Sequence, residues 1–212
     1  MLLASGMDAQ YLGISAGIEL NNTYLLGDEL KGGENYRTYP SFGASFRLDF
    51  GKRSYLNSGI FYGSAGNEIK YYDDFWNVYE VYDYAIKSLK IPVQYGINVL
   101  KSPFQIGIVI GPIVGVGLSG RLKTSIQNQN QDQSVPVGDY NIYKDDDHKQ
   151  KRLFVGLGTG LQFRYRNIGL EILYSGEVFF PDEVTDHPSG YMGIEALTIR
   201  LGYEFKLWGT GN

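Results

Sequence analysis

The sequence predicts an all-β fold, an eight-stranded antiparallel up-and-down transmembrane β-barrel, on three observations. Apolar residues recur at every second position in eight segments, which is the period of a strand with one apolar face. The connections between these segments alternate between short and long. No stretch approaches the roughly 18 consecutive apolar residues of a membrane-spanning helix, whereas 28 glycines and 18 tyrosines are typical of a β-rich chain.

The first half of the chain contains four of these segments. Most segments in the chain reach the ~9–11 residues that a tilted strand needs to cross a bilayer. The alternating apolar positions are Leu12, Ile14, Ile18 and Leu20 in 11–20, Phe42, Ala44, Phe46 and Leu48 in 39–50, Leu56, Ile60 and Tyr62 in 56–63, and Leu89, Ile91, Val93, Tyr95 and Ile97 in 84–99.

The second half contains the other four segments. Val109, Ile113 and Leu173 interrupt the alternation, because they are apolar residues on the face that is otherwise polar or glycine. The regular apolar positions are Phe104, Ile106, Ile108 and Ile110 in 104–118, Leu153, Val155, Leu157 and Leu161 in 152–166, Ile168, Leu170 and Ile172 in 168–177, and Leu197, Ile199, Leu201 and Tyr203 in 197–207.

The lengths of the connections predict an orientation. In an antiparallel barrel all short turns fall at one end and all long loops at the other, and bacterial barrels have short periplasmic turns and long outer loops. Both termini are therefore expected on the periplasmic side of a Gram-negative outer membrane. The short connections are 51–53, 100–103 and 166–167, and the long ones are 21–38, 66–83, 119–150 and 178–190.

The chain is expected to form one barrel domain over 10–212. Residues 1–9 are expected to be a signal-peptide remnant or a disordered tail, because a short apolar stretch precedes small residues and a plausible cleavage position after Ala9.

The residues that alternate with the apolar ones form the other face of each segment. The composition of this face predicts that it points into the barrel. Glycine is frequent on it, which suits a narrow interior, and its cations and anions are nearly balanced, so that they can pair when buried. A soluble lipocalin-like lipid-binding barrel, with the apolar face inside, is the alternative. The charges expected to form an interior network are Glu19, Arg47, Asp49, Lys90, Arg152, Arg164, Arg166, Glu171, Glu177, Arg200 and Glu204.

Several stretches resemble the PorT-like outer-membrane β-barrel family of Bacteroidetes. They are YLGISAG at 11–17, LKIPVQYG at 89–96, FQIGIVIGPIVGVG at 104–117 and LGYEF at 201–205. The resemblance implies an eight-stranded outer-membrane barrel, in a family whose members mostly lack a defined function and of which one branch belongs to a secretion and gliding apparatus. It implies no catalytic residue.

No constellation predicts a catalytic, cofactor-binding or metal site, so no cofactor is expected. His148 follows three aspartates, 145–147, and His187 lies among Asp182, Glu183 and Asp186, but both runs are interpreted as solvated acidic loops. A lipid A-modifying or protease barrel, with Ser189 beside His187, is a minor alternative.

The aromatic residues of 66–83 indicate a loop interaction surface or, equally, a hairpin that prolongs the strands beyond the membrane. They are Tyr71, Tyr72, Phe75, Trp76, Tyr79 and Tyr82.

The sequence therefore predicts a structural or interaction barrel with a filled interior, since eight strands leave space that side chains just fill. A narrow pore for small solutes is the alternative. The expected partners are outer-membrane lipid and lipopolysaccharide, and an envelope protein through the long loops. Nucleic acid is not expected, because the net charge is −4.

Overall fold

The computed structural model describes residues 7–26, 36–50, 53–73, 76, 78–128, 134–144, 150–181 and 191–209. These residues form ten antiparallel strands that belong to one sheet. The strands are β1 (Met7–Leu26), β2 (Arg37–Phe50), β3 (Ser54–Ala65), β4 (Glu68–Asp73), β5 (Val78–Ser102), β6 (Phe104–Asn128), β7 (Ser134–Asn141), β8 (Gln150–Tyr165), β9 (Ile168–Pro181) and β10 (Tyr191–Gly209). In the part of the chain that is described, no helix has the length and apolarity needed to cross a membrane.

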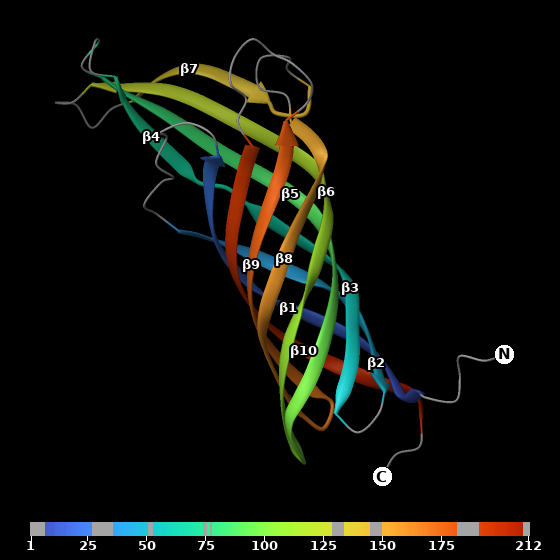
Figure 1. The fold of residues 1–212 in the computed structure, drawn as a ribbon. Helices are drawn as coiled ribbons and strands as arrows, with labels where there is room; N and C mark the ends of the chain where they lie inside the picture. Colours follow the sequence, from blue (N-terminus) through green and yellow to red (C-terminus); the bar gives the residue numbers. More distant parts are fainter. Residues whose placement is uncertain are drawn as a thin grey trace.

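Eight of the strands close into a ring, which confirms the predicted barrel. Each strand of the series β1, β2, β3, β5, β6, β8, β9, β10 pairs with the next, and β10 pairs with β1. Figure 1 shows the strands tilted around a common axis. The start of β1 and the end of β10 lie at the same end, since Ala9 pairs with Gly209. We call this the turn end, because the short connections lie there, and the opposite one the loop end.

Two predicted loops contain further strands. The 66–83 connection holds β4 and the start of β5, and the 119–150 connection holds the end of β6 and β7. β4 pairs with residues 78–83 of β5, and β7 with residues 121–127 of β6. The hairpin interpretation of 66–83 is therefore confirmed.

These additional strands form a protruding sheet, which consists of β4, β7 and the loop-end halves of β5 and β6. It extends beyond the ring at the upper left of Figure 1. β5 and β6 can support it because each has 25 residues, far more than the ~9–11 that one crossing requires.

The first strand begins earlier than the sequence predicts. Met7 pairs with Phe50 and Ala9 with Asp49, so these residues extend β1 and are not part of a tail. The rest of the predicted tail, 1–6, lies outside the described residues.

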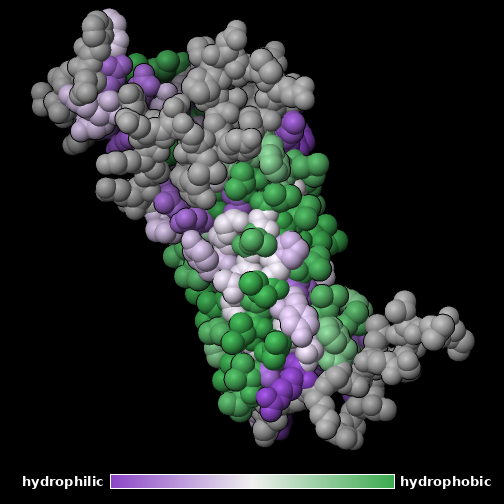
Figure 2. Space-filling view, viewed as in Figure 1, coloured by the Kyte–Doolittle hydropathy of each residue, from purple (hydrophilic) through white to green (hydrophobic). Residues whose placement is uncertain are grey.

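The apolar face points outward, which makes the lipocalin-like alternative wrong. Ile14 is 57% exposed and Leu201 is 61% exposed, whereas alternate residues of the same strands are buried. Figure 2 shows hydrophobic residues covering most of the middle of the visible face. Such a surface costs free energy in water but none against lipid tails.

Candidate functional site in the barrel interior

A buried lysine joins two glutamates at the centre of the ring. Lys90 Nζ of β5 lies 2.9 Å from Glu177 Oε1 of β9 and 3.1 Å from Glu19 Oε2 of β1. Ser41 and Ser175 donate hydrogen bonds to Glu19 and Glu177. We call these three charged residues the Lys90 cluster. Lys90 is 6% exposed and both glutamates are 1% exposed, so the three charges stabilise one another in place of water, although Glu177 Oε2 has no hydrogen-bond partner among the described residues.

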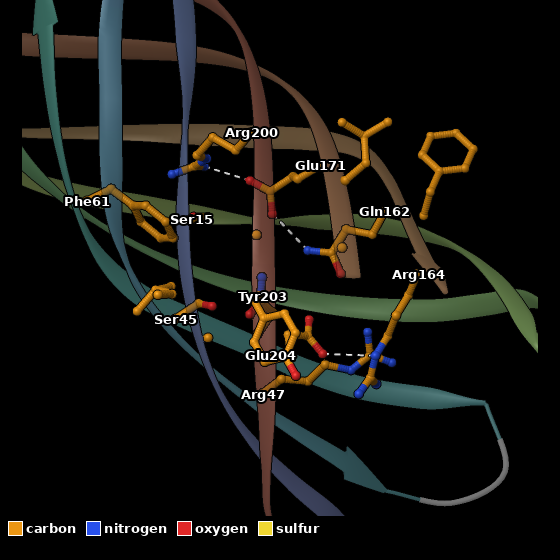
Figure 3. A pocket seen from close by; sticks show the side chains of 17 residues that line it. Ser15, Ser45, Arg47, Phe61, Gln162, Arg164, Glu171, Arg200, Tyr203 and Glu204 are labelled. Carbon is orange, nitrogen blue, oxygen red and sulfur yellow. Dashed lines mark hydrogen bonds and ion pairs between the residues drawn. The ribbon is translucent and has the colours of Figure 1, made fainter. Parts of the chain in front are cut away.

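Three arginine–carboxylate pairs occupy the interior between the Lys90 cluster and the turn end. Arg200 lies 2.6 Å from Glu171, Arg164 lies 2.9 Å from Glu204, and Arg47 lies 2.7 Å from Asp49. Figure 3 shows the Arg200 and Arg164 pairs and the hydrogen bond that Gln162 donates to Glu171, which is 2.8 Å long. Two of these pairs join different strands, β10 with β9 and β8 with β10, whereas Arg47 and Asp49 both belong to β2.

Each of the three arginines also lies over an aromatic ring. The guanidinium carbon is 3.7 Å from the ring centroid of Tyr55 for Arg47, 3.8 Å from that of Tyr11 for Arg164, and 3.7 Å from that of Phe61 for Arg200. Such contacts stabilise a desolvated cation. These aromatic residues were not predicted to be part of the site. Their alternation with outward-facing neighbours is the signal that places them on the inner face.

A small cavity of about 50 Å³ remains among these side chains. Its walls include Ser45, Arg47, Glu171, Arg200 and Glu204 (Figure 3). This volume suits a few water molecules. The turn-end half of the barrel is therefore polar and filled almost completely by its own side chains.

An apolar plug fills the loop-end half of the interior. Phe154 and Phe179, both 0% exposed, stack with their ring centroids 4.5 Å apart. Ile113 and Leu173, which interrupt the alternation in the sequence, are buried in the same cluster. They lie on the turn-end side of the Lys90 cluster, since Ile113 pairs with Pro92 and Leu173 precedes Glu177 on β9. We define the apolar plug as the residues beyond the Lys90 cluster, namely Ile86, Leu122, Ile142, Phe154, Phe179 and Met192.

Glycine makes room for the rings of this interior. A Cβ atom on Gly115 would overlap the ring of Phe154, and one on Gly96 would overlap the ring of Tyr55. The frequent glycines of the inner face thus include positions where a ring from another strand occupies the place of a side chain.

The structure brings together most of the charges that the sequence predicts inside. Buried or half-buried on the inner face are Glu19, Arg47, Asp49, Lys90, Arg164, Glu171, Glu177, Arg200 and Glu204.

Arg152 and Arg166 were wrongly predicted to belong to this network. Arg152 is exposed at the loop end of β8, where it donates to the carbonyl oxygens of Gly117 and Leu118 and lies 4.8 Å from the Tyr143 ring centroid. Arg166 is exposed in the turn between β8 and β9, with a φ of 54°. The strand ends at Tyr165, so alternation no longer determines the direction of the next side chain.

The aromatic residues of the predicted loop surface lie on the protruding sheet. The rings of Tyr72 and Tyr79 are 5.1 Å apart, and Trp76 is 71% exposed. Tyr82 is half-buried like Tyr72 and Tyr79, but it packs against the apolar core and donates a hydrogen bond to Glu80. Tyr71 pairs with Glu80 along the backbone, and Phe75 lies outside the described residues.

Two predicted acidic loops surround the two histidines of the chain. His148, His187, Ser189 and their acidic neighbours lie outside the described residues. Among the residues that are described, no group of three or more His, Cys, Asp or Glu side chains could hold a metal ion.

Comparison with known proteins gives one family. The model of the outer membrane protein beta-barrel domain family matches residues 9–176. No curated protein matches the chain.

Solved structures with a similar fold include three bacterial barrels. Neisserial surface protein A gives a TM-score of 0.48 at 11% identity, over 95% of this chain and 100% of that chain. The outer membrane protease OmpT of Escherichia coli gives 0.47 at 12% identity, over 93% and 97% of the two chains. Ail, the attachment invasion locus protein of Yersinia pestis, gives 0.41 at 16% identity, over 94% and 100%. At these identities the likeness concerns the fold alone.

Proposed function

Because the chain belongs to the outer membrane protein beta-barrel domain family and hence to the outer membrane of Gram-negative bacteria, we propose that it is a closed barrel with a structural or interaction role. In this proposal both termini are periplasmic, and the protruding sheet is displayed outside the cell. The stretches at 89–96 and 104–117 support the narrower assignment to PorT-like barrels.

The observation that carries the proposal is the filled cross-section. A solute that enters from the turn end meets the arginine pairs, then the Lys90 cluster, and then the apolar plug. The cavity below the plug has about 50 Å³ and the space beside the Lys90 cluster about 10 Å³. Neither volume accommodates a hydrated solute. This supports a role on the surface of the barrel over one as a channel.

We expect the folded protein to show no stepwise ion conductance in planar lipid bilayers. The buried rings of Phe154 and Phe179 leave no continuous water path, and opening one would expose the Lys90 cluster. An open porin inserted into the same bilayers is the positive control. Unitary current steps that disappear after the protein is boiled would instead support the narrow-pore alternative.

The orientation is tested by labelling single cysteines, since the chain has no native cysteine. A membrane-impermeant maleimide added to intact cells is expected to label a Trp76→Cys variant but not a Lys206→Cys variant. Both positions are exposed, and they lie at the loop end and the turn end. After lysis both variants should react. Labelling of the Lys206→Cys variant alone in intact cells would show the reverse orientation.

The protruding sheet supports an interaction role. Trp76, Tyr72 and Tyr79 give it an aromatic tip, and exposed aromatic residues are common at the centre of protein interfaces. An envelope protein is one proposed partner, and outer-membrane lipid and lipopolysaccharide are others. The proposal assigns no enzymatic activity, because the ionisable groups of the interior are engaged in pairs and the apolar plug separates them from the loop end.

A further inference from the structure

A groove lies on the outer face of the protein, where the barrel continues into the protruding sheet. Its volume is about 680 Å³, and it crosses β3, β5, β6 and β7. Lys87, Arg121 and Asp139 stand around it, while Ser64, Ala85 and Ser119 line its floor. We call this feature, defined by these six residues, the outer groove.

The groove exists because small side chains interrupt an outer face that is otherwise bulky. Ala85 pairs with Arg121, and Lys87 pairs with both Ser64 and Ser119, so these residues share the outer face. Each of the neighbouring strands β3, β5 and β6 thus contributes a small residue at the same height. These small side chains leave the space between Lys87, Arg121 and Asp139.

The groove lies close to apolar residues of the outer face. Lys87 lies two residues from Leu89 on the outer face of β5, and Ser119 follows Leu118, which is 44% exposed. Two residues of a strand span about 6.6 Å, or less along the membrane normal when the strand is tilted. The polar groups of the groove therefore lie within a headgroup's reach of the residues that contact acyl chains.

The charges around the groove favour an anion. Lys87 is exposed and forms no hydrogen bond or ion pair with any residue in the described ranges. Lys123, two residues beyond Arg121, pairs along the backbone with Asp83 and Asp139, and its charge acts on Asp139 as well. Arg121 donates Nε to Asp139 at 2.6 Å and makes a second contact through Nη2. The hydrogen bond from Arg121 holds the pKa of Asp139 below its usual value.

Asp139 engages only part of the Arg121 guanidinium. A guanidinium has five N–H donors, and two nitrogens face Asp139. Lys87, the remaining donors of Arg121 and the hydroxyls of Ser64 and Ser119 thus offer one ammonium, one guanidinium edge and two neutral donors. This set suits the several acceptor oxygens of a phosphate group.

We propose that the outer groove binds the phosphate of an outer-leaflet lipid headgroup. The inference rests on the proposed orientation, which places the loop end outside. A lipid is favoured over a soluble phosphate because the groove opens onto the apolar surface, so the acyl chains can lie along Leu89 and Leu118 while the headgroup fills the groove.

Native mass spectrometry of the detergent-purified protein tests this site with diphosphorylated lipid A as the probe. The apparent affinity of a Lys87→Gln variant is expected to fall about fivefold, since a lysine at a charged lipid surface contributes about that factor. A Lys206→Gln variant, which removes an exposed cation at the turn end, is the matched control and should bind like the parent. An Ala85→Leu variant keeps every charge but fills the floor, and it should also lose affinity.

Competing probes separate the lipid from the phosphate. Dephosphorylated lipid A should bind weakly, and inorganic phosphate should not displace lipid A, because it lacks the acyl contacts. Equal loss in the Lys87→Gln and Lys206→Gln variants would overturn the site, and so would unchanged binding by the Ala85→Leu variant. Displacement by inorganic phosphate would overturn the lipid assignment.

Failure of this inference can be told from failure of the proposed function. All three substitutions are on exposed positions, and a heat-shift gel establishes that each variant is folded. Conductance and cysteine labelling test the closed barrel and its orientation without reference to the groove. If labelling places the loop end outside and lipid A still binds independently of Lys87 and Ala85, only the lipid site is refuted.

Discussion

Replacement of Lys90 by methionine is expected to lower the free energy of unfolding by about 3–5 kcal/mol, the usual cost of removing one partner from a buried ion pair. Glu19 and Glu177, each 1% exposed, would lose the ammonium group that lies within 3.1 Å of both. Methionine keeps the length and flexibility of the side chain, so the change isolates the charge. Urea unfolding in lipid vesicles, followed by tryptophan fluorescence and by heat-shift gels, measures the effect.

A triple variant distinguishes this mechanism from a loss of packing. Glu19→Gln and Glu177→Gln added to Lys90→Met remove both stranded charges, and most of the lost stability should return. The exposed Lys206→Met variant is the control and should remain within about 0.5 kcal/mol of the parent. If Lys90→Met is as stable as that control, the glutamates do not depend on Lys90 for their burial.

The Gly115→Val substitution is expected to be the second severe change. It should lower the free energy of unfolding by about 3 kcal/mol or prevent folding. The Cβ atom of any residue at Gly115 would overlap the ring of Phe154, which is fully buried and stacked on Phe179. The ring has no empty space into which it can move, and overpacking of this kind costs about 1–3 kcal/mol or more. The urea midpoint and the fraction of protein that shows a heat shift report the loss.

Another glycine provides the matched control for this prediction. Gly176 of β9 has nothing within 4 Å of the position a Cβ atom would take, so Gly176→Ala should change stability by less than about 0.5 kcal/mol. The Phe154→Leu substitution replaces the ring by a shorter side chain, and it should partly restore the stability of a Gly115→Ala variant. A Gly115→Val protein with the parent's urea midpoint would show that Phe154 does not occupy this space in the membrane.

The number of ring strands and the direction of their faces could be predicted from the sequence. Side chains of a strand alternate between two faces, and a membrane barrel requires apolar residues on its outer face. Ile14 and Leu201 were therefore expected to point outward. The same alternation placed Lys90, Arg200 and Glu177 on the inner face. It failed at Arg166, because a turn has no such period.

The partners of the interior charges could not be predicted. Lys90 is separated from Glu19 by 71 residues and from Glu177 by 87, and only ring closure brings the three together. Several carboxylates on the inner face were equally eligible by alternation. The choice among them depends on the stagger of the strands, which the alternation of residues does not indicate.

The sequence by itself determined the eight-stranded ring, its lipid-facing surface and the polar character of half its lining, because these follow from local alternation along each strand. Only the tertiary structure decided that β5 and β6 continue into a protruding sheet, that Phe154 and Phe179 stack in a plug, and that a groove opens beside Lys87. These features depend on which residues of distant strands come to the same height. That height is set by the register of hydrogen bonds around a closed barrel, which no single segment encodes.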